Sequence, residues 1–219
     1  MPKLKSFWLP IVLSIFSLCL TFYFYPSLPS QVPTQWGFNG QVNSYGSRST
    51  IFLIPVLTLA ISLGSWLLPQ IDPRRENYGR FSNTYVIMIS IVSFFMTALH
   101  MLTLTEILRP GLIAMNSLIF TLLSLMFIVF GNYLPKIKHN YFAGIRTAWT
   151  LNDEENWYAT HRFAGPCWVL GGLCMLACIF LPSDYHYLSF MVVLVIVAVI
   201  PSFYSFLFFY RKNKSSSRS

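Results

Sequence analysis

The sequence predicts an all-α integral membrane protein: a bundle of six transmembrane helices, with a short interfacial helix in the loop between the fourth and fifth. The 219 residues are 55% hydrophobic and 10% charged, and their mean hydropathy is +0.57. A soluble domain carries about a quarter charged residues. Six apolar runs are each close to the ~20 residues that a membrane-crossing helix needs. Lys and Arg also alternate from loop to loop, as short loops of a multi-pass protein do.

The six apolar runs form one predicted membrane domain over residues 1–210, with spans at 7–25, 50–68, 85–104, 112–130, 164–181 and 187–210. Two lysines precede the first run, but it is longer than the apolar core of a signal peptide and no A-x-A site follows. We therefore expect it to remain as a span. Pro201, in the middle of the sixth run, predicts a kink whose freed carbonyl needs a partner. Residues 211–219 are basic and serine-rich, and we expect a disordered tail attracted to anionic lipid.

The distribution of basic residues predicts the orientation. Thirteen Lys and Arg lie in segments on the N-terminal side, and only Arg48 and Arg109 lie on the other side. Because short cytoplasmic loops are rich in Lys and Arg, both termini and the loop 131–163 are predicted to be cytoplasmic. The same distribution accounts for the net charge of +8, so membrane lipid, and not nucleic acid, is the expected direct partner.

The sequence offers little for catalysis or metal binding. The four cysteines lie in or beside the predicted spans, and neither C-x-x-C nor H-E-x-x-H, G-x-S-x-G or a Gly-rich phosphate loop is present. The thin set of candidates is His139 and His161 with three acidic residues in the loop 131–163. We therefore expect no catalytic residues, no metal site and no cofactor.

The first outer loop, residues 26–49, contains three prolines and three glycines and almost no charge. This composition predicts an ordered, turn-rich segment rather than a helix. Trp36 is its obvious anchor at the membrane interface. The short basic turn after the second span, around residues 72–80, is expected to serve only orientation.

Two polar residues fall at similar depth in neighbouring spans, His100 in the third and Asn116 in the fourth. They could form a hydrogen bond between helices, and this structural role is favoured over a proton relay. No Asp or Glu falls inside a predicted span, which argues against an ion-coupled transporter.

The loop 131–163 is a polar insert between two apolar spans. Its spacing predicts a short helix at the membrane surface, with Thr150 as the cap and the acidic residues 153–155 near the positive end. Arg162 suits the other end. Trp157 and His161 stand four residues apart and so share one face of this helix.

The same loop carries a family resemblance. Gly131-Asn132, Asn140, the run 144–147 (G-I-R-T), the run 149–151 (W-T-L), Trp157 and His161-Arg162 reproduce the GN…N…GIRTPWTL…W…HR signature of SdpI-like membrane proteins, which this chain resembles. Ala148 stands where that family usually has proline. The segment Y-P-x-L-P…V-P-T-Q-W…N-G…Y, beginning at Tyr25, is similar to the N-terminal half often found in the same family.

The resemblance implies a bacterial inner-membrane protein that is not an enzyme. It would confer immunity to a secreted sporulation-delaying peptide toxin, met outside, and would capture a cytoplasmic autorepressor at the membrane. The residues expected to bind the cytoplasmic partner are Asn132, Asn140, Arg146, Thr147, Trp149, Thr150, Trp157, His161 and Arg162. Those expected on the extracytoplasmic side are Pro33, Trp36, Asn39 and Gly40. The alternatives are a small-molecule, lipid or ion transporter or channel, and a membrane-embedded enzyme.

Overall fold

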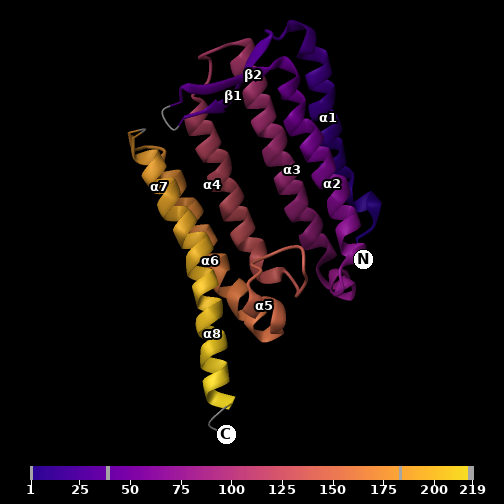
Figure 1. Ribbon diagram of the computed structural model, residues 1–219, viewed down its shortest axis with the longest axis vertical. Helices are drawn as coiled ribbons and strands as arrows, with labels where there is room; N and C mark the ends of the chain where they lie inside the picture. The colour runs from indigo at the N-terminus through magenta and orange to yellow at the C-terminus, as the bar shows by residue number, and fades with distance from the viewer. Residues whose placement is uncertain (1, 38–39, 183, 217–219) are drawn as a thin grey trace.

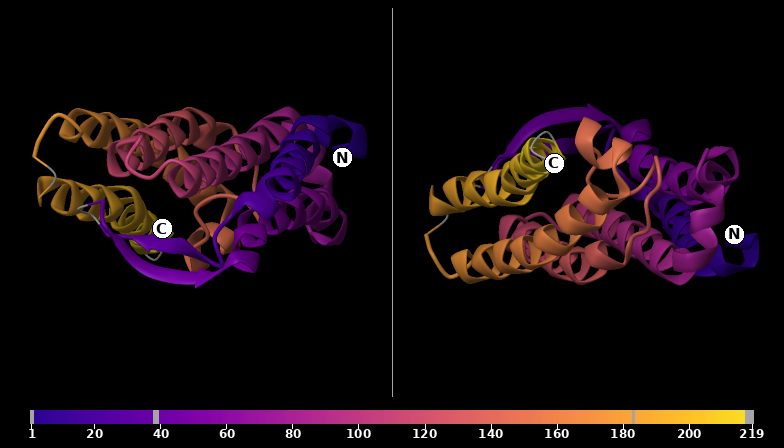
Figure 2. Two further views of the ribbon diagram at one scale, coloured as in Figure 1. Left: turned by 90° about the horizontal axis from the view of Figure 1, so that it is seen from above. Right: turned by 90° about the horizontal axis from the view of Figure 1, so that it is seen from below.

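The computed structural model describes residues 2–37, 40–182 and 184–216, which form a bundle of long helices with a β-hairpin across one end (Figure 1). The helices are α1 (Trp8–Phe24), α2 (Leu53–Ile71), α3 (Tyr78–Leu108), α4 (Met115–Tyr133), α5 (Ala148–Asn152), α6 (Glu154–Cys178), α7 (Asp184–Leu194) and α8 (Ile200–Ser216). The strands are β1 (Gln31–Trp36) and β2 (Val42–Ser47). Viewed along the helices, α1–α3 lie on one side and α6–α8 on the other, with α4 between them (Figure 2).

Five of the six predicted spans coincide with helical segments that are long and apolar enough to cross a membrane: Leu4–Ser27, Arg48–Ile71, Arg75–Leu108, Met115–Lys136 and Tyr185–Lys214. The chain is therefore a multi-pass membrane protein. Helix α6 contains most of the predicted fifth span but is not among the five. Its first turns carry the polar residues of the loop 131–163.

Hydroxyl groups join α1, α2 and α3 inside the apolar layer. Ser14 Oγ lies 3.1 Å from Ser62 Oγ, which lies 3.2 Å from Ser93 Oγ. His100 Nε2 lies 2.7 Å from Thr21 Oγ1 on α1, so the expected hydrogen bond between His100 and Asn116 is wrong. The prediction compared only depth along two helices and could not show which neighbour each side chain faces. His100 nevertheless bonds between helices, as side chains that hold membrane bundles together do.

Glycines bring α4 and α6 into close contact. A Cβ atom at Gly131 would lie 2.6 Å from the carbonyl oxygen of Gly165, and one at Gly172 would lie 2.7 Å from that of Ser124. Small residues allow such backbone approach, which stabilises helix pairs in lipid.

The predicted sixth span corresponds to one helical segment, Tyr185–Lys214. A π-helical turn, Val195–Val199, lies in it between α7 and α8, just before Pro201. The indole nitrogen of Trp168 donates to the carbonyl oxygen of Val197 at 3.0 Å. This residue is four positions before Pro201, whose nitrogen cannot donate in a helix, so the freed carbonyl has its partner.

Strands β1 and β2 pair antiparallel where a turn-rich loop was expected, with register irregularities between Pro33 and Trp36. A two-stranded sheet tolerates proline because both of its strands are edges. Val32 is buried and packs with Ile51 and Leu104, and thereby fixes the hairpin to the ends of α2 and α3.

Two other segments differ from the prediction. The residues assigned to a separate interfacial helix belong to α6, which runs without interruption from Glu154 to Cys178, and the short helix in the loop is α5. Helix α8 continues through Ser216 where a disordered tail was expected. Lys212 in this last part forms ion pairs with Asp153 at 2.7 Å and Glu155 at 2.8 Å, which hold the helix end against the start of α6.

Candidate functional site

The candidate site is the signature loop, residues 131–163, which folds against the turn between α2 and α3 (residues 72–77). Asn77 Nδ2 donates to the carbonyl oxygen of His139 at 2.8 Å. Arg74 Nη2 donates to the carbonyl oxygen of Leu151 at 2.9 Å, and its Nη1 contacts His139 Nε2. Burial, and then the positive charge of Arg74, lower the pKa of His139. The turn between α2 and α3 therefore positions the loop, a role beyond the orientation assigned to it from sequence.

Asp72 is the buried carboxylate at this junction. Its Oδ1 accepts from the backbone N–H of Arg74 at 2.7 Å. Its Oδ2 accepts from the Tyr78 hydroxyl and from the backbone N–H of Tyr141, each at 2.9 Å. A carboxylate that is buried away from water needs several hydrogen-bond donors, and these three donors stabilise Asp72 in its buried position.

Asn140 organises the next part of the loop, and its side chain is fully buried. Its Oδ1 accepts from the backbone N–H groups of Phe142 at 2.8 Å and Ala143 at 2.7 Å, and from the Tyr78 hydroxyl at 3.2 Å. Its Nδ2 donates to the carbonyl oxygens of Lys138 at 2.8 Å and Ala143 at 2.9 Å. Because one amide serves five backbone and side-chain groups, Asn140 shapes the loop from within.

Trp157 and His161 form the buried centre of the site, with their rings stacked at 4.2 Å. Trp157 Nε1 donates to the carbonyl oxygen of Ile137 at 3.0 Å. His161 Nε2 accepts from the backbone N–H of Ile145 at 2.9 Å, so its Nδ1 carries the proton and donates to the Trp157 carbonyl at 2.8 Å. Burial lowers the pKa of His161 to about 4. The ring is therefore neutral at pH 7.

Gly144 explains why the signature needs glycine beside this histidine. Its φ is +113°, a backbone conformation that residues with a Cβ rarely adopt. A Cβ atom there would lie 2.4 Å from His161 Nε2. Glycine thus allows the loop to pass close enough for the bond from Ile145 to His161.

Thr147 and Thr150 begin α5 with a reciprocal capping box. Thr147 Oγ1 accepts from the backbone N–H of Thr150 at 3.1 Å, and Thr150 Oγ1 accepts from the backbone N–H of Thr147 at 2.9 Å. The predicted cap, Thr150, is therefore wrong: Thr147 caps α5 with Thr150 as its partner, and the helix that begins with the acidic residues has its cap one turn later. Asp153 caps α6 by accepting from the backbone N–H of Glu155 at 3.0 Å.

The site also bonds to α8. Asn156 Nδ2 donates to the carbonyl oxygen of Ser205 at 2.9 Å, and the Ser205 hydroxyl donates to Asn156 Oδ1 at 2.9 Å. The same hydroxyl lies 2.9 Å from Thr147 Oγ1. Three segments far apart in sequence, the α2–α3 turn, the signature loop and α8, therefore share one hydrogen-bonded network.

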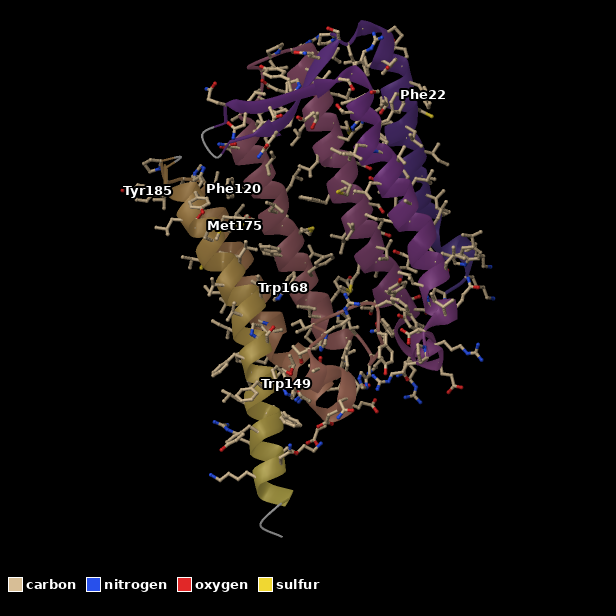
Figure 3. All side chains as sticks on the ribbon, viewed as in Figure 1. Phe22, Phe120, Trp149, Trp168, Met175 and Tyr185 are labelled. Atoms are coloured by element: carbon tan, nitrogen blue, oxygen red, sulfur yellow. The ribbon has the colours of Figure 1, made fainter. Side chains whose placement is uncertain are left out.

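Five of the predicted partner-binding residues keep some exposure: Asn132, Arg146, Thr147, Trp149 and Arg162. Arg146 is exposed and donates from Nη1 to the carbonyl oxygen of Tyr141 at 2.9 Å. Trp149 is half-buried beside α8, with its ring 5.2 Å from that of Phe206 (Figure 3). Asn132 and Arg162 are exposed, and Asn132 Nδ2 bonds only within its own helix, to the carbonyl oxygen of Ile128. Arg146, Thr147 and Trp149 lie between α4 and α6, and the Thr147 hydroxyl is already bonded to Thr150 and Ser205.

An open pocket of about 360 Å³ adjoins this surface. It is lined by Arg74, Asn77 and His139 together with Asn152 and Glu154. Sequence reasoning missed Asp72, Arg74 and Asn77 because they lie some 60 residues before the signature, and only the fold brings the two together.

The hairpin, whose strand β1 carries Pro33 and Trp36, lies at the opposite end of the molecule from α5 (Figure 1). Pro33 and Trp36 line a cavity of about 140 Å³ between the hairpin and the helices α2 and α3. Gly40 lies over Asn116, whose amide nitrogen would be 3.6 Å from a Cβ at Gly40. Asn39 falls outside the residues that the structure describes. The two groups of predicted residues thus lie at opposite ends of the molecule.

Comparison with known proteins places both ends in context. The model of the SdpI/YfhL protein family matches residues 136–205, and that of a domain of unknown function, DUF1648, matches residues 12–59. The chain is 30% identical over 212 residues to "Immunity protein SdpI" of Bacillus subtilis (strain 168), a match that covers 94% of this chain and 98% of that relative. No solved structure matches the chain.

Proposed function

We propose that this chain, which belongs to the SdpI/YfhL protein family, protects its cell against a secreted peptide toxin and retains a cytoplasmic repressor at the membrane. The observation that carries the proposal is the similarity to an immunity protein along almost the whole of both chains. The family is named for immunity, and it is not a family of enzymes. The direct test is to challenge a toxin-sensitive bacterium with and without this gene. Survival only with the gene supports the proposal, and equal killing contradicts it.

The proposed topology has six spans, with α6 as the fifth, and both termini in the cytoplasm. It is supported by the excess of Lys and Arg on the side of the signature loop. An impermeant thiol reagent applied to intact cells tests it, in a variant whose four native cysteines are replaced. We expect labelling of Asn43→Cys, at the hairpin, and none of Lys138→Cys, in the signature loop. Equal labelling of both would contradict the orientation.

The proposed docking surface for the repressor consists of Arg146 and Trp149. An arginine offers a rigid, permanently charged set of donors and a tryptophan a large apolar face, and both are enriched at the centres of protein interfaces. Asn140, Thr150, Trp157 and His161, which were expected to bind the partner, are buried. In this proposal they hold the loop in shape and do not touch the partner.

Substitution of the two exposed residues tests the docking surface. Loss of an interface anchor lowers binding free energy by ~2 kcal/mol, or about thirtyfold in affinity, whereas an exposed loop substitution changes stability by at most about 0.5 kcal/mol. We therefore expect Arg146→Ala and Trp149→Ala to insert normally but to retain little repressor when membranes are sedimented. The matched control is Arg75→Ala, an exposed arginine in the α2–α3 turn. Full retention by both loop variants would contradict this surface.

A further inference from the structure

A second pocket, the far-end pocket, is lined by residues of the hairpin, the end of α3, the α3–α4 turn, the start of α4 and α7. The hairpin lies at the end of the molecule opposite α5 (Figure 1). Its volume is about 420 Å³, within the usual range for a small-molecule site. Gly40, with φ +81°, brings the hairpin over the start of α4. Glu106 at the end of α3 and His186 on α7 supply the ionisable side chains of its wall.

Only one of the two carboxylate oxygens of Glu106 accepts a hydrogen bond within the described part of the protein. Its Oε1 accepts from the backbone N–H of Gly111 at 3.1 Å, in a turn that Gly111 forms with φ +76°. Its Oε2 is buried and has no hydrogen-bond partner among the described residues. The turn therefore fixes the carboxylate and leaves one oxygen available as an acceptor.

His186 leaves one ring nitrogen available in the same way. The side chain is only 5% exposed, and its Nε2 lies 3.1 Å from the carbonyl oxygen of Leu181. A carbonyl oxygen only accepts, so Nε2 carries the proton and Nδ1 of the neutral ring is an acceptor. This Nδ1 is buried and, like Glu106 Oε2, has no partner in the part of the chain that the structure describes.

Glu106 and His186 both line the pocket, and each has one buried acceptor atom without a partner, so we expect the pocket to favour a ligand that donates hydrogen bonds. Buried polar groups without partners are unfavourable, so a group that bonds to both gains free energy on binding. None of the described residues lining the pocket is Lys or Arg. A metal ion fits less well, because no group of three His, Cys, Asp or Glu side chains is placed to hold one among the described residues. The complementary group has a positive charge and several N–H bonds.

We propose that the far-end pocket binds a protonated primary amine, whose N–H groups donate to Glu106 Oε2 and His186 Nδ1. The amine belongs either to a small molecule or to a lysine side chain or N-terminus of a peptide. The peptide source rests on the proposed function, since it would give the chemistry by which a secreted toxin is met. Amine binding itself does not depend on that function.

The test uses the full chain purified in lipid nanodiscs and calorimetric titration with butylammonium. We expect saturable binding, and binding of butyltrimethylammonium at least about tenfold weaker, because it has the same charge but no N–H to donate. Equal binding of the two cations, or no binding of butylammonium, overturns the proposal. This comparison needs no variant, so it does not depend on whether a substituted protein folds.

Two substitutions then locate the site. Glu106→Gln replaces the free acceptor by an amide while keeping an oxygen for Gly111, and His186→Phe keeps an aromatic ring beside Phe120, 5.3 Å away in the native protein. Each should weaken butylammonium binding about tenfold or more, whereas Glu76→Gln, an exposed acid at the other end, should not. Unchanged affinity in Glu106→Gln and His186→Phe overturns the assignment to this pocket.

A short peptide with one lysine, acetylated and amidated at its ends, distinguishes the two sources. Binding tighter than that of butylammonium supports a peptide ligand, and weaker binding supports a small amine. If the protein bound butylammonium but failed to protect cells from toxin, the proposed function would be lost and the pocket assignment would stand. Protection without any amine binding would overturn the pocket assignment alone.

Discussion

The two ends of this membrane protein use their polar residues in opposite ways. At the signature loop, the buried side chains of Asp72, Asn140 and His161 all find partners. At the hairpin end, buried atoms of Trp36, Glu106 and His186 have none among the described residues. The end richer in polar residues is thus the one whose hydrogen-bonding capacity is already used by the fold. In the signature loop, the polar residues therefore stabilise the fold. The hairpin end has fewer polar residues, and it is the end that keeps acceptor atoms for a ligand.

The largest expected effect is a difference in the free energy of unfolding between alanine variants of two asparagines in the signature. Asn140→Ala removes a side chain with five hydrogen bonds and leaves buried backbone groups unpaired, which should lower the free energy of unfolding by about 3 kcal/mol or more. Asn132→Ala removes one exposed bond within a helix and should change it by less than about 0.5 kcal/mol. Denaturation of both variants in detergent measures the difference. Equal stability would mean that the loop is not a scaffold.

The next largest effect is a pH dependence of stability that arises from His161 in the signature loop. The pKa of His161 is 6.5 in the unfolded chain and is lowered by burial to about 4 in the folded one. Between pH 6.5 and pH 4, His161 is therefore neutral in the folded protein and protonated in the unfolded chain, so unfolding takes up a proton. The contribution of the neutral ring to the free energy of unfolding is complete above pH 6.5 and is lost as the pH falls towards 4. The loss is on the order of 3 kcal/mol.

Melting temperatures across this pH range measure the effect. His161→Gln should be less stable at pH 7 but should lose less on acidification. The pKa of His139 is lowered in the same direction, so some dependence should remain in that variant. A His161→Gln protein with the full native pH dependence would show that His161 is not its source.

The smallest effect compares two tryptophans, one from each end. Trp157→Phe loses the bond to the Ile137 carbonyl and leaves that oxygen buried, which should destabilise the protein by about 1–3 kcal/mol. Trp36→Phe removes a buried indole N–H that has no partner, and should be within about 0.5 kcal/mol of the native protein. Chemical denaturation of the pair gives the comparison. A large loss at Trp36 would mean that its N–H is satisfied in solution.

Hydropathy predicted the spans well because membrane crossing depends on length and composition, which a single sequence displays. The family resemblance is likewise confirmed by the relatives. The hydrogen-bond partner of His100 was missed because it depends on which helices face each other. The hairpin was missed because a strand that contains proline resembles a loop in its composition. Within the candidate site, the sequence singled out Asn140, Trp157 and His161 as partner-binding residues but could not show that they are buried. Asp72 and Arg74 joined the site only through tertiary contacts.

The sixth span physically connects the two ends. Helix α7 carries His186 to the far-end pocket, and α8 carries Ser205 to the network around Thr147 and Asn156. Between them lies a single joint, the π-helical turn closed by the bond from Trp168 to Val197. One helical segment, Tyr185–Lys214, therefore reaches from the far-end pocket to the signature-loop network, so a shift of this segment along its axis would be felt at both ends.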